Sequence, residues 1–407
     1  MYDVIVVGAR CAGSPTALLL ARKGYRVLLV DRATFPSDTI STHYVRLPGA
    51  RALHRWGLLG AVLATNCPAV LGRTMHREGE PSLAGDAPPP PDIPGEVGPR
   101  RTVLDKLLVD AAVRAGVELR ERFVFEDVRW EEARVRGIRG RTRAGTGVVE
   151  LARLVVGADG KRSPVARAVH ASALRAAPLQ TFGYYAYWAD LPLHGVEGSH
   201  SSSRRCMFVS IPTNDGLSMV LVQSAMANFP AFRADIARSY HRALEIAPTF
   251  AERVRAARQV ERFRGSADLI NVVRRAYGPG WALVGDAGFC QDPIRAQGIT
   301  DAFLDVERLV EAADAGLSGR QPLDIALATY EERRNDAAFP SLDATCRAAE
   351  FRPDPPEARL LRAAMREDQD LVDAYVGISV GTVTSDEFRA RTPEEVRRLF
   401  EATQRAA

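Results

Sequence analysis

The first 31 residues carry the pattern that most constrains the fold: a strand, a glycine-rich turn, a helix and a second strand that ends in an acid. Residues 3–7 are apolar on both faces, as in the central strand of a parallel sheet. Gly8 allows a tight turn toward a phosphate, and Gly13 lets the helix pack closely on the strand. Asp31 ends the second strand 23 positions after Gly8, the separation at which an acid meets an adenosine ribose. The pattern predicts a parallel α/β sheet that starts with a dinucleotide-binding unit.

One position departs from the usual G-x-G-x-x-G pattern. Arg10 stands where the middle glycine would make room for a pyrophosphate. We predict that its guanidinium reaches over the phosphates as an added clamp, and the alternative is an arginine that points to solvent. Cys11, Ala12 and Arg32, which flank the turn and the acid, are further candidates for cofactor binding.

A second stretch, residues 154–169, reads LVVGADGKRSPVARAV. It places Asp159 and the following glycine in a turn after an apolar strand, and Ser163 is positioned to cap the next helix. A simple NAD-dependent dehydrogenase would need no such stretch. It therefore favours FAD over NAD as the dinucleotide.

A third stretch, residues 281–302, reads WALVGDAGFCQDPIRAQGITDA. A short strand runs into Gly285 and Asp286, and the chain then loops through Pro293 before a helix begins near Gly298. Asp286 is suited to accept hydrogen bonds from sugar hydroxyls, and the unpaired amides near Gly298 and Ile299 favour negative charge. The stretch predicts a site for a polar cofactor such as flavin, whose reduced form is an anion.

These three stretches, in this order and at these separations, resemble the FAD-dependent para-hydroxybenzoate hydroxylase superfamily, which includes aromatic monooxygenases, geranylgeranyl reductases and flavin-dependent halogenases. The resemblance covers roughly residues 1–310. It implies an α/β protein with a Rossmann-like FAD-binding domain, an inserted substrate domain built on an antiparallel sheet, and a helical C-terminal tail. The expected boundaries are residues 1–175 with 264–335, 176–263, and 336–407.

The resemblance also implies roles for residues outside the three stretches. Residues 35–46 run beside the flavin in this superfamily, so His43, Tyr44 and Arg46 are candidates for the active-site wall; an ordinary loop role is an equal alternative for His43. An arginine that opens an R-x-x-L helix contacts the cofactor in relatives, and Arg101 matches it, with Arg100 as the neighbouring alternative. Arg295 stands where many relatives have glycine, and we expect it either to add positive charge beside the reduced flavin or to point to solvent.

The implied activity is that of an FAD-dependent monooxygenase. NAD(P)H would reduce the flavin, and a flavin C4a-hydroperoxide formed with dioxygen would oxygenate a small aromatic substrate. The chain has a single dinucleotide fingerprint, which fits a nicotinamide donor without its own Rossmann domain and equally a partner reductase. A prenyl-chain reductase of the geranylgeranyl type and a flavin-binding protein without turnover remain alternatives. A halogenase is disfavoured because the chain lacks W-x-W-x-I-P and has no lysine between residues 71 and 94.

Composition narrows the range of partners. The formal net charge of +4 is small for 407 residues, which argues against nucleic acid or an anionic membrane as a partner. The five cysteines form no C-x-x-C pair and favour reduced thiols, and no metal site is expected. No apolar run reaches membrane-spanning length and no signal peptide is evident. We expect a cytoplasmic monomer or homodimer that acts on a small molecule.

The remaining secondary structure follows from periodicity. Residues 68–99 are predicted to be an irregular surface excursion, and residues 118–156 an antiparallel meander. In the substrate domain, Tyr185 and Tyr187 share one strand face, so only their face or the opposite one can line a pocket. We expect most aromatic side chains of this domain to pack in its core. The expected strands are residues 181–190, 205–211 and 217–223, and the expected helices are 47–59, 101–116, 229–257, 301–315, 323–346 and a broken tail over 362–403.

Overall fold

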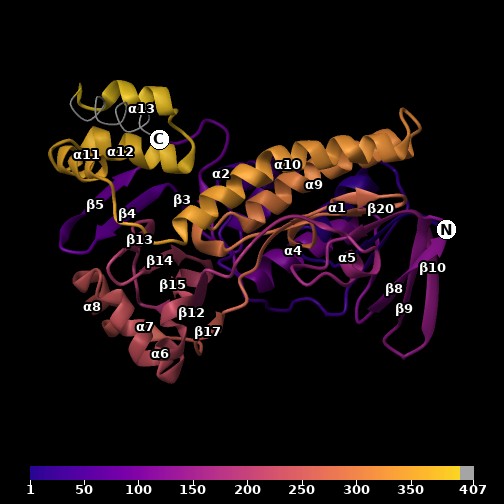
Figure 1. The fold of residues 1–407 in the computed structure, drawn as a ribbon, viewed down its shortest axis with the longest axis horizontal. Coiled ribbons are helices and arrows are strands. Elements are labelled where there is room, and N and C mark those ends of the chain that lie inside the picture. Colours follow the sequence, from indigo (N-terminus) through magenta and orange to yellow (C-terminus); the bar gives the residue numbers. More distant parts are fainter. Residues whose placement is uncertain (395–407) are drawn as a thin grey trace. The chain divides into compact units, whose positions relative to one another are not determined.

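The computed structural model describes residues 1–394, which form two compact units, each assembled from separated segments of the chain (Figure 1). Unit 1 consists of Met1–Val62, Pro99–Leu179 and Leu269–Cys346. Unit 2 consists of Leu63–Gly98, Gln180–Asp268 and the chain from Arg347 onward.

Unit 1 is built on a mixed sheet whose centre is parallel, as the sequence predicts. The strand order is β19 (Tyr277–Gly278), β20 (Trp281–Leu283), β10 (Gly147–Gly157), β1 (Tyr2–Val7), β2 (Val27–Val30) and β7 (Glu118–Arg120). All neighbours from β20 to β7 are parallel. Ile5 lies opposite Leu28 and Val155, and all three are fully buried in one core cluster. Central strands covered on both faces explain why residues 4–7, which follow Asp3, are uniformly apolar.

Helices and two smaller sheets surround this sheet. The predicted meander is confirmed: β8 (Val124–Glu131) pairs antiparallel with β9 (Arg134–Arg141), and β9 pairs antiparallel with the start of β10. A three-stranded sheet contains β11 (Ala173–Ala177), β18 (Asn271–Arg274) and β21 (Phe289–Cys290). The helices are α1 (Gly13–Arg22), α2 (Leu47–Arg55), α3 (Leu59–Leu63), α4 (Arg101–Arg114), α5 (Pro164–Ala168), α9 (Gly298–Leu317) and α10 (Leu323–Ala348).

Unit 2 is built on a second, mostly antiparallel sheet, and its predicted strands are confirmed. The strand order is β16 (Arg258–Gln259), β12 (Thr181–Ala189), β15 (Ser218–Ala225), β14 (Cys206–Pro212), β13 (Val196–His200), β4 (Gly72–Arg77) and β5 (Glu80–Asp86), with β17 (Arg264–Ser266) also on β12. The helices of this unit are α6 (Phe229–Ala234), α7 (Ile236–Leu244), α8 (Pro248–Ala256), α11 (Pro356–Glu367), α12 (Gln369–Val380) and α13 (Ser385–Arg391).

The two faces of β12 have different partners. Phe182, Ala186 and Trp188 pack in one core cluster with side chains of α6, α7 and α8, which lie together beside the sheet (Figure 1). Tyr185 and Tyr187 lie on the opposite face, where their rings meet edge to face at 5.7 Å. The face that carries Tyr185 and Tyr187 is therefore the one that α6–α8 leave uncovered.

One prediction about unit 2 is wrong. Residues 68–99 are not an irregular excursion, because they contain β3 (Ala69–Val70), β4, β5 and β6 (Glu96–Val97). β4 pairs in parallel with β13, so its partner lies more than a hundred residues away in the sequence. β5 is the last strand of the sheet and alternates exposed and buried residues, with Leu83 among the buried ones. A short polar edge hairpin gives only a weak apolar pattern, which is why it reads as a loop.

The unit boundaries also differ from the predicted domain boundaries. Leu63–Gly98 belongs to unit 2 rather than to the nucleotide-binding part, and the helical tail is divided between the units near Cys346 and Arg347. The tail is helical and broken where expected, at Pro355 and at Gly381, which has φ 95°. Its predicted continuation to residue 403 extends beyond the described residues. Within residues 1–394, no helix combines the length and apolar character needed to cross a membrane.

Candidate functional site

The turn between β1 and α1 can be formed only by glycine at two positions. Gly8 has φ 103°, and a Cβ there would lie 2.4 Å from the carbonyl oxygen of Ala158. A Cβ on Gly13 would lie 1.7 Å from the carbonyl oxygen of Gly8. Ala12 is the N-cap residue of α1, and no side chain in the described part of the chain caps that helix. The first and second sequence stretches therefore touch, and they leave a helix N-terminus open to an anion.

The third stretch packs on the same turn. Gly285 has φ 60°, and a Cβ there would lie 2.7 Å from the Cβ of Ala12. Asp286 follows, and its side chain is exposed, although the surrounding protein raises the pKa of its carboxyl by desolvation. The positive charges of Arg101 and Lys161 partly offset this rise in pKa. All three predicted stretches thus meet at the N-terminus of α1.

The start of α9 provides a second open helix end. Asp292 accepts a hydrogen bond from the amide of Ile294 at 3.0 Å and so caps the short turn that contains Pro293. Within residues 1–394, no side chain caps α9, and no heavy atom lies within 4 Å of a Cβ placed on Gly298. Ile299 behind it is buried. The first turn of α9 therefore borders open space, and its place beside the flavin stays a prediction.

Asp31 and Asp159 each organise a turn. Asp31 accepts hydrogen bonds from the amides of Ala9 and Ala33, both at 2.7 Å. Asp159 accepts from the Ser163 hydroxyl and from the amide of Val165 at 2.9 Å, and desolvation raises the pKa of its carboxyl. Ser163 caps α5 as predicted. Each carboxylate oxygen has a second lone pair, so these bonds leave capacity for a ligand hydroxyl.

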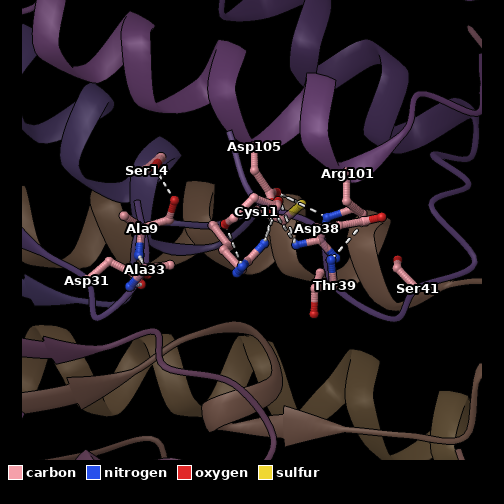
Figure 2. Close-up of polar contacts among 12 residues, drawn as sticks. Ala9, Cys11, Ser14, Asp31, Ala33, Asp38, Thr39, Ser41, Arg101 and Asp105 are labelled. Carbon is pink, nitrogen blue, oxygen red and sulfur yellow. Dashed lines mark hydrogen bonds and ion pairs between the residues drawn. The ribbon is translucent and has the colours of Figure 1, made fainter. Parts of the chain in front are cut away.

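Arg10 and Arg101 converge on an acid that sequence reasoning missed. Asp105 is fully buried on α4 and accepts two hydrogen bonds from Arg101, each of 3.0 Å (Figure 2). Arg10 reaches the same carboxylate at 2.6 Å and also donates to the Ser37 hydroxyl at 3.0 Å. Arg10 therefore does not point freely into solvent, and its role as a phosphate clamp stays a prediction. The only sequence signal for Asp105 is its i,i+4 spacing from Arg101.

The segment before α2 lies against the start of α9. His43 is fully buried with φ 39°, and its amide donates to the Ser41 hydroxyl at 3.0 Å. Tyr44 is also buried, and the amide of Arg46 donates to the Thr300 hydroxyl at 2.9 Å. The structure thus places His43 and Tyr44 in the interior, and a role in the active-site wall stays a prediction for all three candidates.

Two further arginines lie on the far side of the Gly285–Asp286 turn. Arg274, also missed from sequence, donates to the carbonyls of Ala287 and Lys161, both at 2.9 Å, and so joins the second stretch to the third. Arg295 is half-buried and donates to the carbonyl of Ser341 on α10 at 3.4 Å. Arg295 therefore contacts α10, which neither sequence alternative foresaw.

Comparison with known proteins identifies the family. The family model described as an FAD binding domain matches residues 1–345. The chain belongs to this family. The site suits FAD. The open ends of α1 and α9 favour a pyrophosphate and an anionic flavin, and the carboxylates of Asp31 and Asp286 are suited to bind sugar hydroxyls. The open space at Gly298 leaves room for the flavin ring. The chain is therefore a flavoprotein of an oxidoreductase family.

Curated relatives carry different activities. Tryptophan 2-halogenase of Chondromyces crocatus is 26% identical over 80% of this chain, which spans only 63% of that protein. Digeranylgeranylglycerophospholipid reductase 2 of Methanopyrus kandleri is 28% identical, with 83% of this chain and 80% of that protein covered. Kynurenine 3-monooxygenase of Salinispora arenicola is 28% identical, with 81% of this chain and 76% of that protein covered. The myxobacterial chondrochloren halogenase shares the fold, with a TM-score of 0.77, 23% identity and coverage of 98% of this chain and 96% of that one.

Proposed function

We propose that the chain is an FAD-dependent monooxygenase that uses NAD(P)H and dioxygen to oxygenate a small aromatic substrate. The observation that carries the proposal is the meeting of Gly8, Ala12, Ala158 and Gly285 at one open helix end in unit 1, which supports the binding of a dinucleotide there. The similarity to kynurenine 3-monooxygenase over 81% of the chain supports oxygen transfer as the reaction. Bound FAD would supply the activation of dioxygen.

The residues of the chain would bind and orient the cofactor. Amides at the start of α1 would hold the pyrophosphate, and Asp31 and Asp286 would accept hydrogen bonds from sugar hydroxyls. Amides at the start of α9 would stabilise negative charge on the reduced flavin. Arg101 would add positive charge near Asp286.

The proposed substrate class rests on the similarity to kynurenine 3-monooxygenase. The face of β12 that α6–α8 leave uncovered carries Tyr185 and Tyr187, and Met219 and Leu221 lie opposite them on β15. All four side chains are buried, each at most 5% exposed, so this face is packed against other protein atoms.

The positions of the lysines argue against halogenation. Lys23 pairs with Asp314 at 3.0 Å, and Lys106 pairs with Asp110 at 2.5 Å on α4. Lys161 lies in the turn after Asp159. All three lysines of the chain therefore belong to unit 1, and none stands in unit 2 where a halogenase-type lysine would be expected.

The test begins with the FAD-loaded protein mixed anaerobically with NADH or NADPH. We expect loss of the oxidised flavin spectrum and its return in air. Incubation with a panel of aromatic compounds, NADPH and air should give a product heavier by one oxygen atom, detected by mass spectrometry. Turnover that requires a halide and gives halogenated product would contradict the proposal.

A prenyl-chain reductase is the second candidate. The digeranylgeranylglycerophospholipid reductase matches this chain over 80% of its own length, more than the halogenase does. Polyprenyl substrates should then gain two hydrogen atoms per double bond under anaerobic conditions, with no oxygen incorporated. A flavin that no nicotinamide reduces and that yields no product with either substrate class would indicate a partner reductase or a binding protein without turnover.

A further inference from the structure

A buried carboxylate stands between two arginines directly beneath the β1–α1 turn. Figure 2 shows Arg101 and Cys11 turned toward Asp105. The Cys11 sulfur lies 3.3 Å from one carboxylate oxygen, and the two guanidinium groups of Arg10 and Arg101 donate to the same carboxylate. We call Arg10, Cys11, Arg101 and Asp105 the Asp105 cluster.

The Asp105 cluster has more positive than negative charge. Both guanidinium groups are permanently protonated, whereas burial raises the pKa of the Cys11 thiol and keeps it neutral. Within the cluster, one carboxylate therefore faces two cations. The charge of Asp286 also acts on Arg101, but Lys161 and Arg274 act on Asp286 as further cations, so positive charge stays in excess. The side chain of Asp105 is inaccessible to solvent and that of Arg101 is only 10% exposed, so water screens this charge poorly.

The excess charge lies next to an open helix end. Arg10 and Cys11 immediately precede Ala12, the N-cap residue of α1, whose first turn contains no acidic residue. A helix N-terminus carries partial positive charge and unpaired amides, and both favour an anion. Two independent features thus call for an anion at one place. In a chain of the FAD-binding family, the pyrophosphate of FAD is the anion that fits.

We infer that Asp105 is a positioning residue for the FAD pyrophosphate, because it fixes Arg10 and Arg101 so that their excess charge lies beside the first turn of α1. The inference rests on the FAD site described in the proposed function. It also explains how an arginine is accommodated where the usual pattern has glycine: Asp105 and Ser37 hold the Arg10 guanidinium to the side of the turn.

Two roles for Asp105 predict opposite effects of its removal. A carboxylate that only neutralises the arginines weakens anion binding, so its loss would tighten the binding of FAD. A carboxylate that positions the two arginines holds their charge beside the pyrophosphate site, so its loss would weaken the binding of FAD. The sign of the change in affinity therefore distinguishes the two roles.

The experiment compares the full-length chain with its Asp105→Asn variant after bound flavin is removed. Titrations with FAD, ADP and riboflavin give three dissociation constants for each protein. We expect Asp105→Asn to weaken FAD and ADP by about 10- to 100-fold, as for loss of charge-assisted hydrogen bonds, and to leave riboflavin unchanged because riboflavin has no phosphate. Asp110→Asn is the matched control, since Asp110 lies on the same helix and, within residues 1–394, pairs with Lys106 alone, in a partly exposed position.

Each other outcome has a definite meaning. Unchanged or tighter FAD binding by Asp105→Asn overturns the inference, and so does an equal loss for riboflavin, which would indicate general disruption. Failure of the wild-type chain to bind FAD would instead refute the proposed function. If Asp105→Asn does not fold, Asp105→Glu keeps the negative charge but moves the carboxylate away from the two guanidinium groups it holds. Weaker FAD and ADP binding with unchanged riboflavin binding then supports the inference, and wild-type affinity overturns it.

Discussion

Arg274 joins two of the three cofactor stretches through one side chain. Its guanidinium donates to the carbonyls of Lys161 and Ala287, and its own carbonyl accepts from the buried Arg334 at 2.6 Å. Arginine suits this position because its fixed fork reaches two acceptors at once, which the single ammonium of lysine does less well.

We predict that Arg274→Ala weakens FAD binding by about 1–3 kcal/mol, because two carbonyls lose a charged donor and the two turns lose their connection. Arg274→Lys should recover only part of this loss. Flavin titration of the three proteins measures the effect. Equal affinities for all three would show that the backbone alone holds the turns in place.

Arg295 lies close to the start of α9, where the reduced flavin is expected. Its half-buried guanidinium donates to the Ser341 carbonyl, and its charge partly offsets the rise in the pKa of Asp301 that desolvation causes. We predict that Arg295→Ala lowers the reduction potential of bound FAD by about 10 to 30 mV, because a positive charge near the anionic reduced form is lost. Potentiometry measures this shift, and FAD occupancy should stay near the wild-type value. A potential equal to that of the wild type would place Arg295 outside the flavin's electrostatic environment.

At the scale of an element, α9 carries two acids that face the interior. Asp301 accepts a hydrogen bond from Gln291 at 2.7 Å, and Asp305 accepts from Arg308 at 2.7 Å. Desolvation, reinforced by the charge of Asp305, raises the pKa of Asp301 to about 7, and desolvation raises that of Asp305 to about 6. In the unfolded chain both would ionise near pH 4. The folded protein therefore binds more protons than the unfolded chain between about pH 4 and 7.

The sign of the stability change follows from this proton uptake. A raised pKa in the folded state stabilises the protein at acidic pH, and the effect is lost as pH rises through about 7. We predict that Asp301→Asn, which cannot ionise, is more stable than the wild type at pH 8 by about 1–2 kcal/mol and gains little at pH 5. Urea denaturation at both values tests this.

Asp314→Asn on the same helix is the control of opposite sign. Its hydrogen bond with Arg320, together with those from Tyr25 and Lys23, lowers the pKa of the Asp314 carboxyl. Loss of this carboxylate should destabilise the protein at pH 8. If the free energy of unfolding of Asp301→Asn changed with pH in parallel with that of the wild type, the pH-dependent loss of stability could not be assigned to Asp301.

At the scale of the whole molecule, segments far apart in sequence complete each unit. In unit 2 the C-terminal helices pack on the β4–β5 hairpin: a Cβ on Gly85 would lie 2.5 Å from a carboxylate oxygen of Asp373 on α12. Glu80 accepts hydrogen bonds from Arg362 at 2.9 and 3.0 Å and from Arg366. The tail from Arg347 to residue 394 is thus a component of unit 2.

We predict that Glu80→Gln lowers the free energy of unfolding at pH 7 by about 1 kcal/mol, a modest value because the ion pairs are partly exposed. The hydrogen bond from Arg362 is the main cause that lowers the pKa of Glu80 to about 2. The contribution is therefore present above about pH 4.5 and is lost as pH falls toward 2. Thermal melts at pH 7 and pH 3 should show a smaller difference between variant and wild type at the lower pH. A constant difference would assign the effect to packing.

The sequence by itself determined the nucleotide-binding half and most of the elements. Gly8, Asp159 and Gly285 mark turns whose geometry depends on neighbouring residues, and strand and helix periodicities are likewise local. Such signals can be read one segment at a time. The sequence could therefore predict the parallel sheet, the unpaired amides at the start of α9 and, with the family resemblance, the cofactor class.

Only the tertiary structure decided which distant side chains meet. Asp105 became a partner of Arg10 because α4 packs on α1, and Arg274 reached two turns because β18 lies beside both. The β4–β5 hairpin became part of a sheet because β13 pairs with it. Neither a buried ion pair nor a parallel strand partner leaves a local pattern, since each depends on residues that only the folded chain brings together.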